Sequence, residues 1–181
     1  PLDGIPFHPY YTVKALFFLG VFLLIFCAIV FFAPTFGGLF LEMPNFEPAN
    51  PMQTPPHIVP VWYFTPFYAM LRAVPSFLGT QVWGVIVMFA AIAVLFLLPW
   101  LDRAPVRSIR YRGPLWKIAL GIFVVSFIAL GYLGLQPATG ILPLLSQIFT
   151  VVYFLFFLLM PWYTRIDSTT TPPERVTYDA H

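Results

Sequence analysis

The residue types best able to support chemistry lie together in segment 54–75, which reads TPPHIVPVWYFTPFYAMLRAVP. It holds five aromatic residues and five prolines, but only one histidine and one charge, Arg72. A soluble loop is more polar than this, and a membrane-spanning helix has fewer prolines. A stiff aromatic segment between apolar runs suits a flat apolar ligand, such as a quinone ring that enters from the lipid. The alternative is an interfacial belt, where Trp and Tyr gather without a ligand.

The chain around this segment is too apolar for an ordinary soluble domain. Hydrophobic residues make up 60% of its 181 residues and charged residues 9%, whereas a soluble domain has about 25% charged residues. A helix needs about 20 residues to cross the hydrocarbon core. Uncharged apolar runs of suitable length occupy 15–34, 79–100, 118–135 and 143–163. The sequence therefore predicts an all-α membrane protein with four transmembrane helices.

The charges predict how these helices cross the membrane. Five basic residues and one acidic residue lie in the loop 101–117, whereas the loop 35–78 has Arg72 as its only base and the loop 136–142 has no charge. Because basic loops remain on the cytoplasmic or matrix side, we expect 101–117 there, together with the N-terminal segment 1–14 and the tail 164–181. The loop 35–78 is then outside. Anionic lipid head groups, and not nucleic acid, are the expected partners of the basic loop.

The long outer loop is predicted to contain short surface helices. Pro60 opens a segment that Pro75 ends, and Pro66 within it predicts either a break or two short helical pieces. We expect the aromatic side of these pieces on the membrane surface or against the helices, with Arg72 facing head groups or a partner.

The spacing HIxPxWYFxPFYAxLRxxP over residues 57–75 resembles the quinol-oxidising (Qo) loop of cytochrome b, the membrane subunit of the cytochrome bc1 complex. Segments 3–14, 45–55 and 99–112 resemble that family's entry to its fifth helix, its approach to the Qo loop and the loop after its sixth helix. The resemblance covers nearly all of this chain but only the C-terminal half of the family protein. It implies part of a proton-translocating quinol–cytochrome c oxidoreductase that is not catalytic alone. The implied location is the bacterial cytoplasmic membrane or the mitochondrial inner membrane.

The resemblance assigns roles to individual residues of this loop. Tyr63 matches the tyrosine of the family's Pro-Glu-Trp-Tyr tetrapeptide, and Tyr68 matches an aromatic residue of the pocket; both are implied to be catalytic. The implied quinone-binding residues of the Qo site are Ile58, Pro60, Val61, Tyr63, Phe64 and Tyr68. His57 matches a loop histidine, which we interpret as a hydrogen-bonded structural residue.

Val61 departs from the family pattern, because the family has a glutamate there that is thought to accept a quinol proton. Valine cannot accept it. Glu42 and Glu47 are the carboxylates of this outer loop, and they are candidate proton acceptors. The alternatives are water, a carboxylate from another part of the protein, or two ordinary solvated charges.

A weaker match concerns the quinone-reducing (Qi) side. Phe7, Tyr11 and Lys14 fall on family positions that line or neighbour the Qi site. Ala15 stands where the family commonly has an aspartate. Lys14 is equally well explained as a long side chain that reaches from the first helix to water.

The expected cofactors are a quinol/quinone pair, with ubiquinone as the expected type, and heme b. The family ligates its hemes through histidines of the N-terminal half. The three histidines here, His8, His57 and His181, lie outside the predicted spans, so no metal ligand is assigned to this chain. The expected partners are that N-terminal heme-binding half, the Rieske iron–sulfur protein and cytochrome c1, in a dimeric complex. Because the chain starts at Pro1, we expect it to be processed or part of a longer polypeptide.

Two other functions compete with this one. A non-catalytic four-helix scaffold with a degenerate quinone pocket would explain why Val61 and Ala15 replace protonatable residues. A small transporter would predict charges or broken helices within the spans. The uncharged runs disfavour the transporter, and the retained Tyr63 and Tyr68 favour the electron-transfer subunit over the scaffold.

Overall fold

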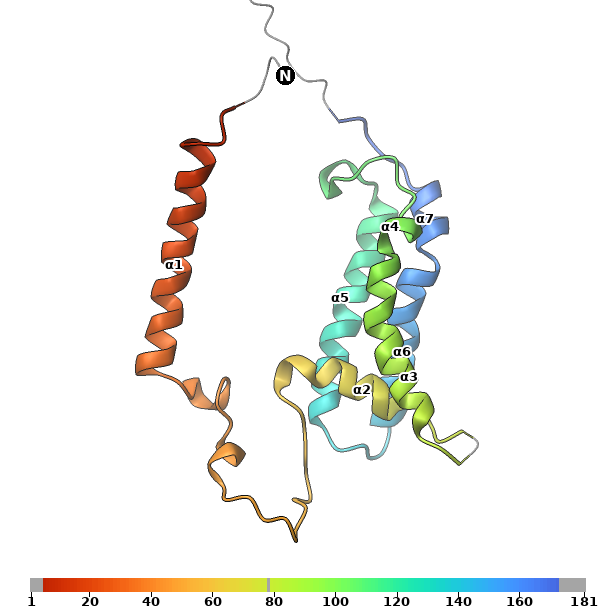
Figure 1. Cartoon of the computed structure of the whole chain (residues 1–181). Coiled ribbons are helices and arrows are strands. Elements are labelled where there is room, and N and C mark those ends of the chain that lie inside the picture. Colours follow the sequence, from red (N-terminus) through yellow and green to blue (C-terminus); the bar gives the residue numbers. More distant parts are fainter. Residues whose placement is uncertain (1–4, 78, 173–181) are drawn as a thin grey trace, which may run out of the picture. The chain divides into compact units, whose positions relative to one another are not determined.

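Helices form all the regular structure of the computed structural model, which describes residues 5–77 and 79–172 (Figure 1). No β-strand occurs in these two ranges. The predicted all-α class is therefore confirmed. Residues 173–181 of the predicted tail, His181 among them, lie outside the description. The described residues divide into two units, one of residues 5–54 and the other of residues 55–172.

The first unit contains the helix α1, Tyr10–Phe32, followed by 3₁₀ turns at Phe36–Gly38 and Met43–Phe46. No side chain of α1 is buried within the described chain. The helix ends just before Pro34, whose ring disfavours helical geometry in the preceding residue. Its start lies five residues before the predicted run 15–34, because a run without charges excludes Lys14. A helix end accommodates a lysine whose long side chain reaches water.

The second unit is a bundle of three long helical stretches. Helix α3, Val82–Ala93, continues through a 3₁₀ turn into α4, Leu98–Leu101; α5 spans Pro114–Leu135; and α6, Leu142–Leu158, is followed by α7, Met160–Ile166. Pro99 lies at the start of α4, and Pro161 lies at the start of α7. Because proline lacks the N–H and clashes with the carbonyl four residues earlier, it interrupts each stretch.

Within residues 5–77 and 79–172, three helical stretches are long and apolar enough to cross a membrane: Tyr10–Phe32, Val82–Leu101 and Pro114–Leu135. The pair α6 and α7 forms a fourth if its 56° bend lies within one span. Four spans, as predicted, thus require this bent pair to cross as a unit.

The core of the second unit lies where α2, a short helix at Thr65–Ala73, meets α3, α5 and α6. Ala69, Ala91 and Leu130 have no exposed surface, and Tyr153 is 2% exposed. The Tyr153 hydroxyl donates to the Ala91 carbonyl at 2.8 Å, which gives the buried phenol its partner.

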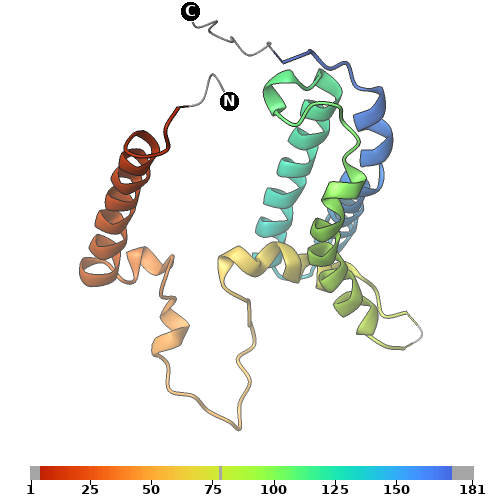
Figure 2. The same cartoon turned by 45° about the horizontal axis from the view of Figure 1, so that its top comes forward.

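The two ends of this bundle differ in character. Helix α2 and the turn between α5 and α6 lie at one end, and the loop between α4 and α5 lies with α7 at the other (Figures 1 and 2). The aromatic segment and the basic loop are therefore separated by the length of the bundle. This arrangement suits opposite membrane sides, and which side each faces stays a prediction.

Candidate functional site

The aromatic segment folds as two short helical pieces that meet between Phe64 and Thr65, just before Pro66. A 3₁₀ turn, Trp62–Phe64, runs directly into α2. The Phe64 amide donates to the Val61 carbonyl at 2.8 Å, and the Thr65 hydroxyl donates to the Trp62 carbonyl at 2.6 Å. Pro66 falls in the first turn of α2, where its missing N–H has no intrahelical partner to lose. The prediction of two pieces is confirmed.

Helix α2 lies across the ends of α5 and α3, with small residues at the closest points. A Cβ atom on Gly134 would collide with the Thr65 carbonyl, and one on Gly84 would collide with the Leu71 carbonyl. The buried face of α2 consists of Thr65, Pro66, Ala69, Met70 and Ala73. The backbones therefore approach more closely than ordinary side chains would permit.

Arg72 fastens α2 to the C-terminal end of α5. Its Nη2 donates to the carbonyls of Leu133 and Gln136, each at 2.7 Å. The last carbonyls of a helix lack intrahelical partners and carry partial negative charge, so a guanidinium suits them. The expectation that Arg72 faces head groups or a partner is wrong, because the open end of α5 engages it within the chain.

The same arginine supports one of the predicted site residues. The Arg72 guanidinium carbon lies 5.2 Å from the centre of the Tyr68 ring, within the range of a cation–π contact. Tyr68 is half-buried. Its ring is thus held against a cation that two backbone carbonyls keep in place.

The other aromatic residues of the segment are exposed. Trp62, Tyr63 and Phe64 have 44%, 53% and 55% of their surface exposed. The ring centres of Tyr63 and Phe64 are 4.7 Å apart, and those of Trp62 and Tyr63 are 5.4 Å apart at nearly right angles. Among the described residues, the hydroxyls of Tyr63 and Tyr68 make no hydrogen bond. The segment thus offers stacking faces and free phenol groups.

The remaining predicted Qo residues precede this aromatic turn. Pro60 and Val61 are half-buried, and Ile58 and His57 are exposed. Val61 forms the N-cap of the 3₁₀ turn, one residue before Trp62. Glu42 and Glu47 flank the turn Met43–Phe46 in the first unit. Both carboxylates belong to the first unit, whereas Tyr63 and Tyr68 belong to the second, so their role as proton acceptors stays a prediction.

The three predicted Qi residues lie together around the start of α1. The rings of Phe7 and Tyr11 are stacked with centres 6.0 Å apart. The Lys14 ammonium is 5.8 Å from the centre of the Tyr11 ring. His8 also makes a local contact, through its Nδ1, with the Thr12 hydroxyl at 3.3 Å. A column of aromatic and cationic groups therefore follows one side of the first turns.

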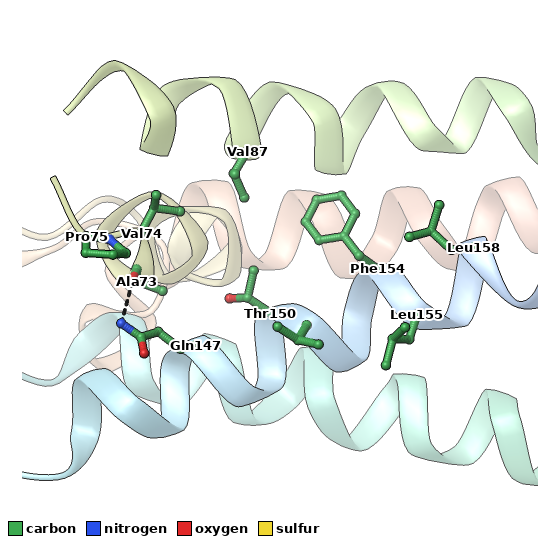
Figure 3. Close-up of a pocket in the computed structure, with 10 residues that line it drawn as sticks. Ala73, Val74, Pro75, Val87, Gln147, Thr150, Phe154, Leu155 and Leu158 are labelled. Carbon is green, nitrogen blue, oxygen red and sulfur yellow. Dashed lines mark hydrogen bonds between the residues drawn. The ribbon is translucent and has the colours of Figure 1, made fainter. Parts of the chain in front are cut away.

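A cavity of about 340 Å³ lies beside the C-terminal end of α2 (Figure 3). Its lining is almost wholly apolar and comes from the end of α2, from Val87 of α3 and from one side of α6. Gln147 of α6 donates to the Ala73 carbonyl at 3.1 Å and so ties α2 to α6. None of the predicted site residues lines this cavity.

Sequence reasoning overlooked Gln147 and Gly134 as positioning residues. A polar residue such as Gln147 in an apolar helical run is a usable signal, because its amide requires partners. Gly134 carries no signal of its own, since a glycine in a helix has many explanations.

Comparison with known proteins identifies relatives of the chain. Residues 48–154 match the family described as Cytochrome b(C-terminal)/b6/petD. The chain is 69% identical over 177 residues to cytochrome b of Allochromatium vinosum, covering 98% of the chain and 43% of that relative. It is 53% identical over 169 residues to cytochrome b of Rhodospirillum rubrum, covering 91% of the chain and 40% of the relative.

A solved structure gives the same result in three dimensions. A chain of a structure titled "Hyperthermophilic respiratory Complex III" superposes with a TM-score of 0.77 at 40% identity, covering 90% of this chain and 39% of that one. The sequence thus spans less than half the length of each of these relatives.

Proposed function

The chain belongs to the family of C-terminal cytochrome b segments, and on that premise we propose that it forms much of the quinol-oxidising pocket of a cytochrome bc1 complex. The activity of the whole complex is proton-coupled electron transfer from quinol to cytochrome c. The missing partners are the N-terminal heme-binding half, the Rieske iron–sulfur protein and cytochrome c1. The complex is a dimer in an energy-transducing membrane, namely the bacterial cytoplasmic or mitochondrial inner membrane.

One observation carries this proposal: an exposed aromatic turn rests on a firmly anchored helix. Apolar rings that face outward from a packed bundle form a surface that another part of the protein or a ligand can cover. Tyr63 and Phe64 supply stacking faces, and aromatic pairs favour offset or tilted arrangements such as theirs. Tyr68, with its hydroxyl unpaired among the described residues, supplies a hydrogen-bonding group.

The residues of this chain then bind and orient the quinol. The ring stacks against Tyr63 and Phe64, and the Tyr68 hydroxyl bonds one quinol oxygen. Arg72 keeps Tyr68 in place through its bonds to the end of α5. Oxidation releases two electrons and two protons from the quinol. The electrons leave to acceptors carried by the partner subunits.

The proton route differs from that of the family, because Val61 has no ionisable group. We assign the acceptance of the proton to water or to a carboxylate outside the second unit, with Glu42 and Glu47 as candidates from this chain. The Qi side, with Phe7, Tyr11 and Lys14, is a second proposed quinone contact. Among described residues, neither His8 nor His57 lies within a helix, so the proposed heme ligands belong to the N-terminal half.

The experiment that tests the proposal measures quinol–cytochrome c turnover of the assembled complex carrying Tyr63→Ala or Tyr68→Ala. Each change removes a ring contact or a hydrogen bond of about 1–3 kcal/mol, so we expect turnover to fall about tenfold or more. Tyr132→Ala is the matched control, because this tyrosine of α5 is exposed, at 61%, as Tyr63 is, at 53%, but lies outside the segment. Its turnover should be unchanged.

The scaffold remains the second candidate, and Val61 and Ala15 favour it because both lack protonatable groups. Wild-type turnover in both tyrosine variants of a fully assembled complex would make the scaffold the better account.

A further inference from the structure

A second cavity of the second unit lies at the end opposite the aromatic segment. Its volume is about 750 Å³, which is within the range of small-molecule sites. The basic loop forms its entrance, and α4, α5 and the junction of α6 with α7 form its sides. Trp116 and Phe123 both line it from α5, and their spacing along the helix extends the cavity about 10 Å into the bundle.

The inner walls of this cavity are apolar. Phe123, Phe156, Phe157 and Met160 contribute side chains from α5, α6 and α7. The rings of Phe123 and Phe156 are 4.4 Å apart and form a continuous aromatic wall. Such walls accommodate a hydrocarbon chain but offer no partner to a polar ring.

The entrance, by contrast, is cationic. Arg107 is exposed and lines the cavity, and Arg112 lines it from a buried position, with 8% of its surface exposed. Five basic residues and one acidic residue occur in the loop 101–117. The acidic residue, Asp102, is already paired with both terminal nitrogens of Arg112, at 3.2 and 2.6 Å. Arg107 makes no ion pair with another described residue, and the Asp167 carboxylate near Trp116 is engaged by the amides of Leu115 and Trp116. The charge of Arg107 is therefore left for an external anion.

Two buried N–H groups beside the cavity lack acceptors. The Nε of Arg112 and the Nε1 of Trp116 are covered and have no hydrogen-bond partner among the described residues. The Arg112 guanidinium carbon lies 4.7 Å from the centre of the Trp116 ring, so the two donors are neighbours. Buried donors normally have partners, and these two point to an oxygen-rich group that completes the site.

We propose that this cavity binds one anionic phospholipid, with its phosphate at Arg107, Arg112 and Trp116 and an acyl chain along Phe123 and Phe156. The positive charge of Arg107 favours an anionic head group. The apolar walls favour a lipid over free phosphate, because only a lipid has an acyl chain to place there. Basic pockets between helices on the inner side of a membrane are suited to such head groups. The site is separate from the aromatic segment and does not depend on quinol oxidation.

The test uses the intact membrane complex that contains this chain, reconstituted in vesicles with a phosphatidylglycerol that carries a diazirine in its acyl chain. Crosslinks should map to the peptide with Phe156 and Met160, and the matching phosphatidylcholine probe should give about fivefold fewer, because one arginine at the surface attracts an anionic lipid to about this extent. Excess inorganic phosphate should not compete.

Arginine variants localise the head group. Arg107→Gln should lower crosslinking by phosphatidylglycerol about fivefold, while Arg107→Lys retains it because the charge remains. Arg110→Gln is the matched control, since Arg110 belongs to the same loop, is exposed and does not line the cavity. Equal crosslinking by the two lipids, or no loss with Arg107→Gln, would overturn the proposal. Competition by inorganic phosphate would identify a phosphate site and also overturn it.

Discussion

Val61 is the residue that most clearly separates this chain from the family pattern. It is half-buried at the N-cap of the aromatic turn. A carboxylate placed there would sit next to Trp62 and Tyr63, close to the proposed quinol ring. This position therefore reports directly on how the proton leaves.

We expect Val61→Glu to leave quinol–cytochrome c turnover unchanged or to lower it, because another acceptor already serves and a half-buried charge is costly to desolvate. The measurement is turnover of the assembled complex as a function of pH. Val61→Gln is the matched control, since glutamine has the shape of glutamate but no ionisable group. A rise in turnover with glutamate but not with glutamine would mean that proton removal limits the native site.

Residue types in the segment predicted a stiff aromatic surface, and the resemblance to the family, rather than composition, assigned Tyr63, Phe64 and Tyr68 to a quinone site. The partner of Arg72 could not be predicted, because its acceptors, Leu133 and Gln136, are 61 and 64 residues away along the chain. A contact of that separation depends on the packing of α2 across α5, which local patterns do not encode. The sequence therefore indicated the aromatic character of the segment but not the contacts that hold it in place.

Helix α2 is the element on which the account depends, since it positions the aromatic turn. Its close contact with α5 requires a hydrogen at residue 134 in place of a methyl group. Gly121, in the same helix, has open space where a Cβ would be added. These two glycines form a matched pair for testing the contact.

Gly134→Ala should lower the thermal midpoint of the assembled complex and its quinol turnover, because overpacking at a tight contact costs about 1–3 kcal/mol. Gly121→Ala should leave both unchanged or raise the midpoint slightly, since alanine is the better helix former. The thermal midpoint is measured by monitoring intrinsic fluorescence during thermal unfolding. If the two variants behave alike, the close approach of α2 and α5 does not position the site.

At this scale the uncharged runs located every long helix, but their ends were displaced. Helix α5 begins at Pro114, four residues before the predicted run 118–135, because the run excludes Lys117. Helices α6 and α7 meet at a 56° bend next to Pro161. The proline is visible in the sequence, but the angle could not be predicted from it. The first charged residue marks the end of an uncharged run in the sequence. The end of a helix depends instead on backbone hydrogen bonds, which can continue past that residue.

For the whole molecule, the charges predict that the loop 35–78 and the basic loop 101–117 lie on opposite sides of the membrane. We expect a cysteine at Asn50 to react with an impermeant thiol reagent added from outside, and one at Ser108 to react only after the membrane is made permeable. Both are introduced in a chain with Cys27→Ala, so that the native cysteine does not contribute. The reverse labelling would contradict the topology and the Qo assignment with it.

The chain covers less than half of the length of its cytochrome b relatives. Aromatic side chains that other segments could cover are exposed on its surface. The aromatic turn at Trp62, Tyr63 and Phe64 is exposed in the second unit, as expected for one wall of a pocket completed by other segments. Composition indicated a membrane protein, and the 57–75 motif together with the matching segments 3–14, 45–55 and 99–112 indicated the family. The other walls of the proposed pocket could not be predicted, because they are proposed to come from segments outside residues 1–181.

The most direct test of the central claim is photolabelling of the intact complex with an azido-quinone, followed by mapping of the adducts. We predict adducts on the peptide that contains Tyr63, Phe64 and Tyr68, and their loss when excess unlabelled quinol is present. Adducts that inactivate quinol oxidation yet fall only outside this segment would contradict the account.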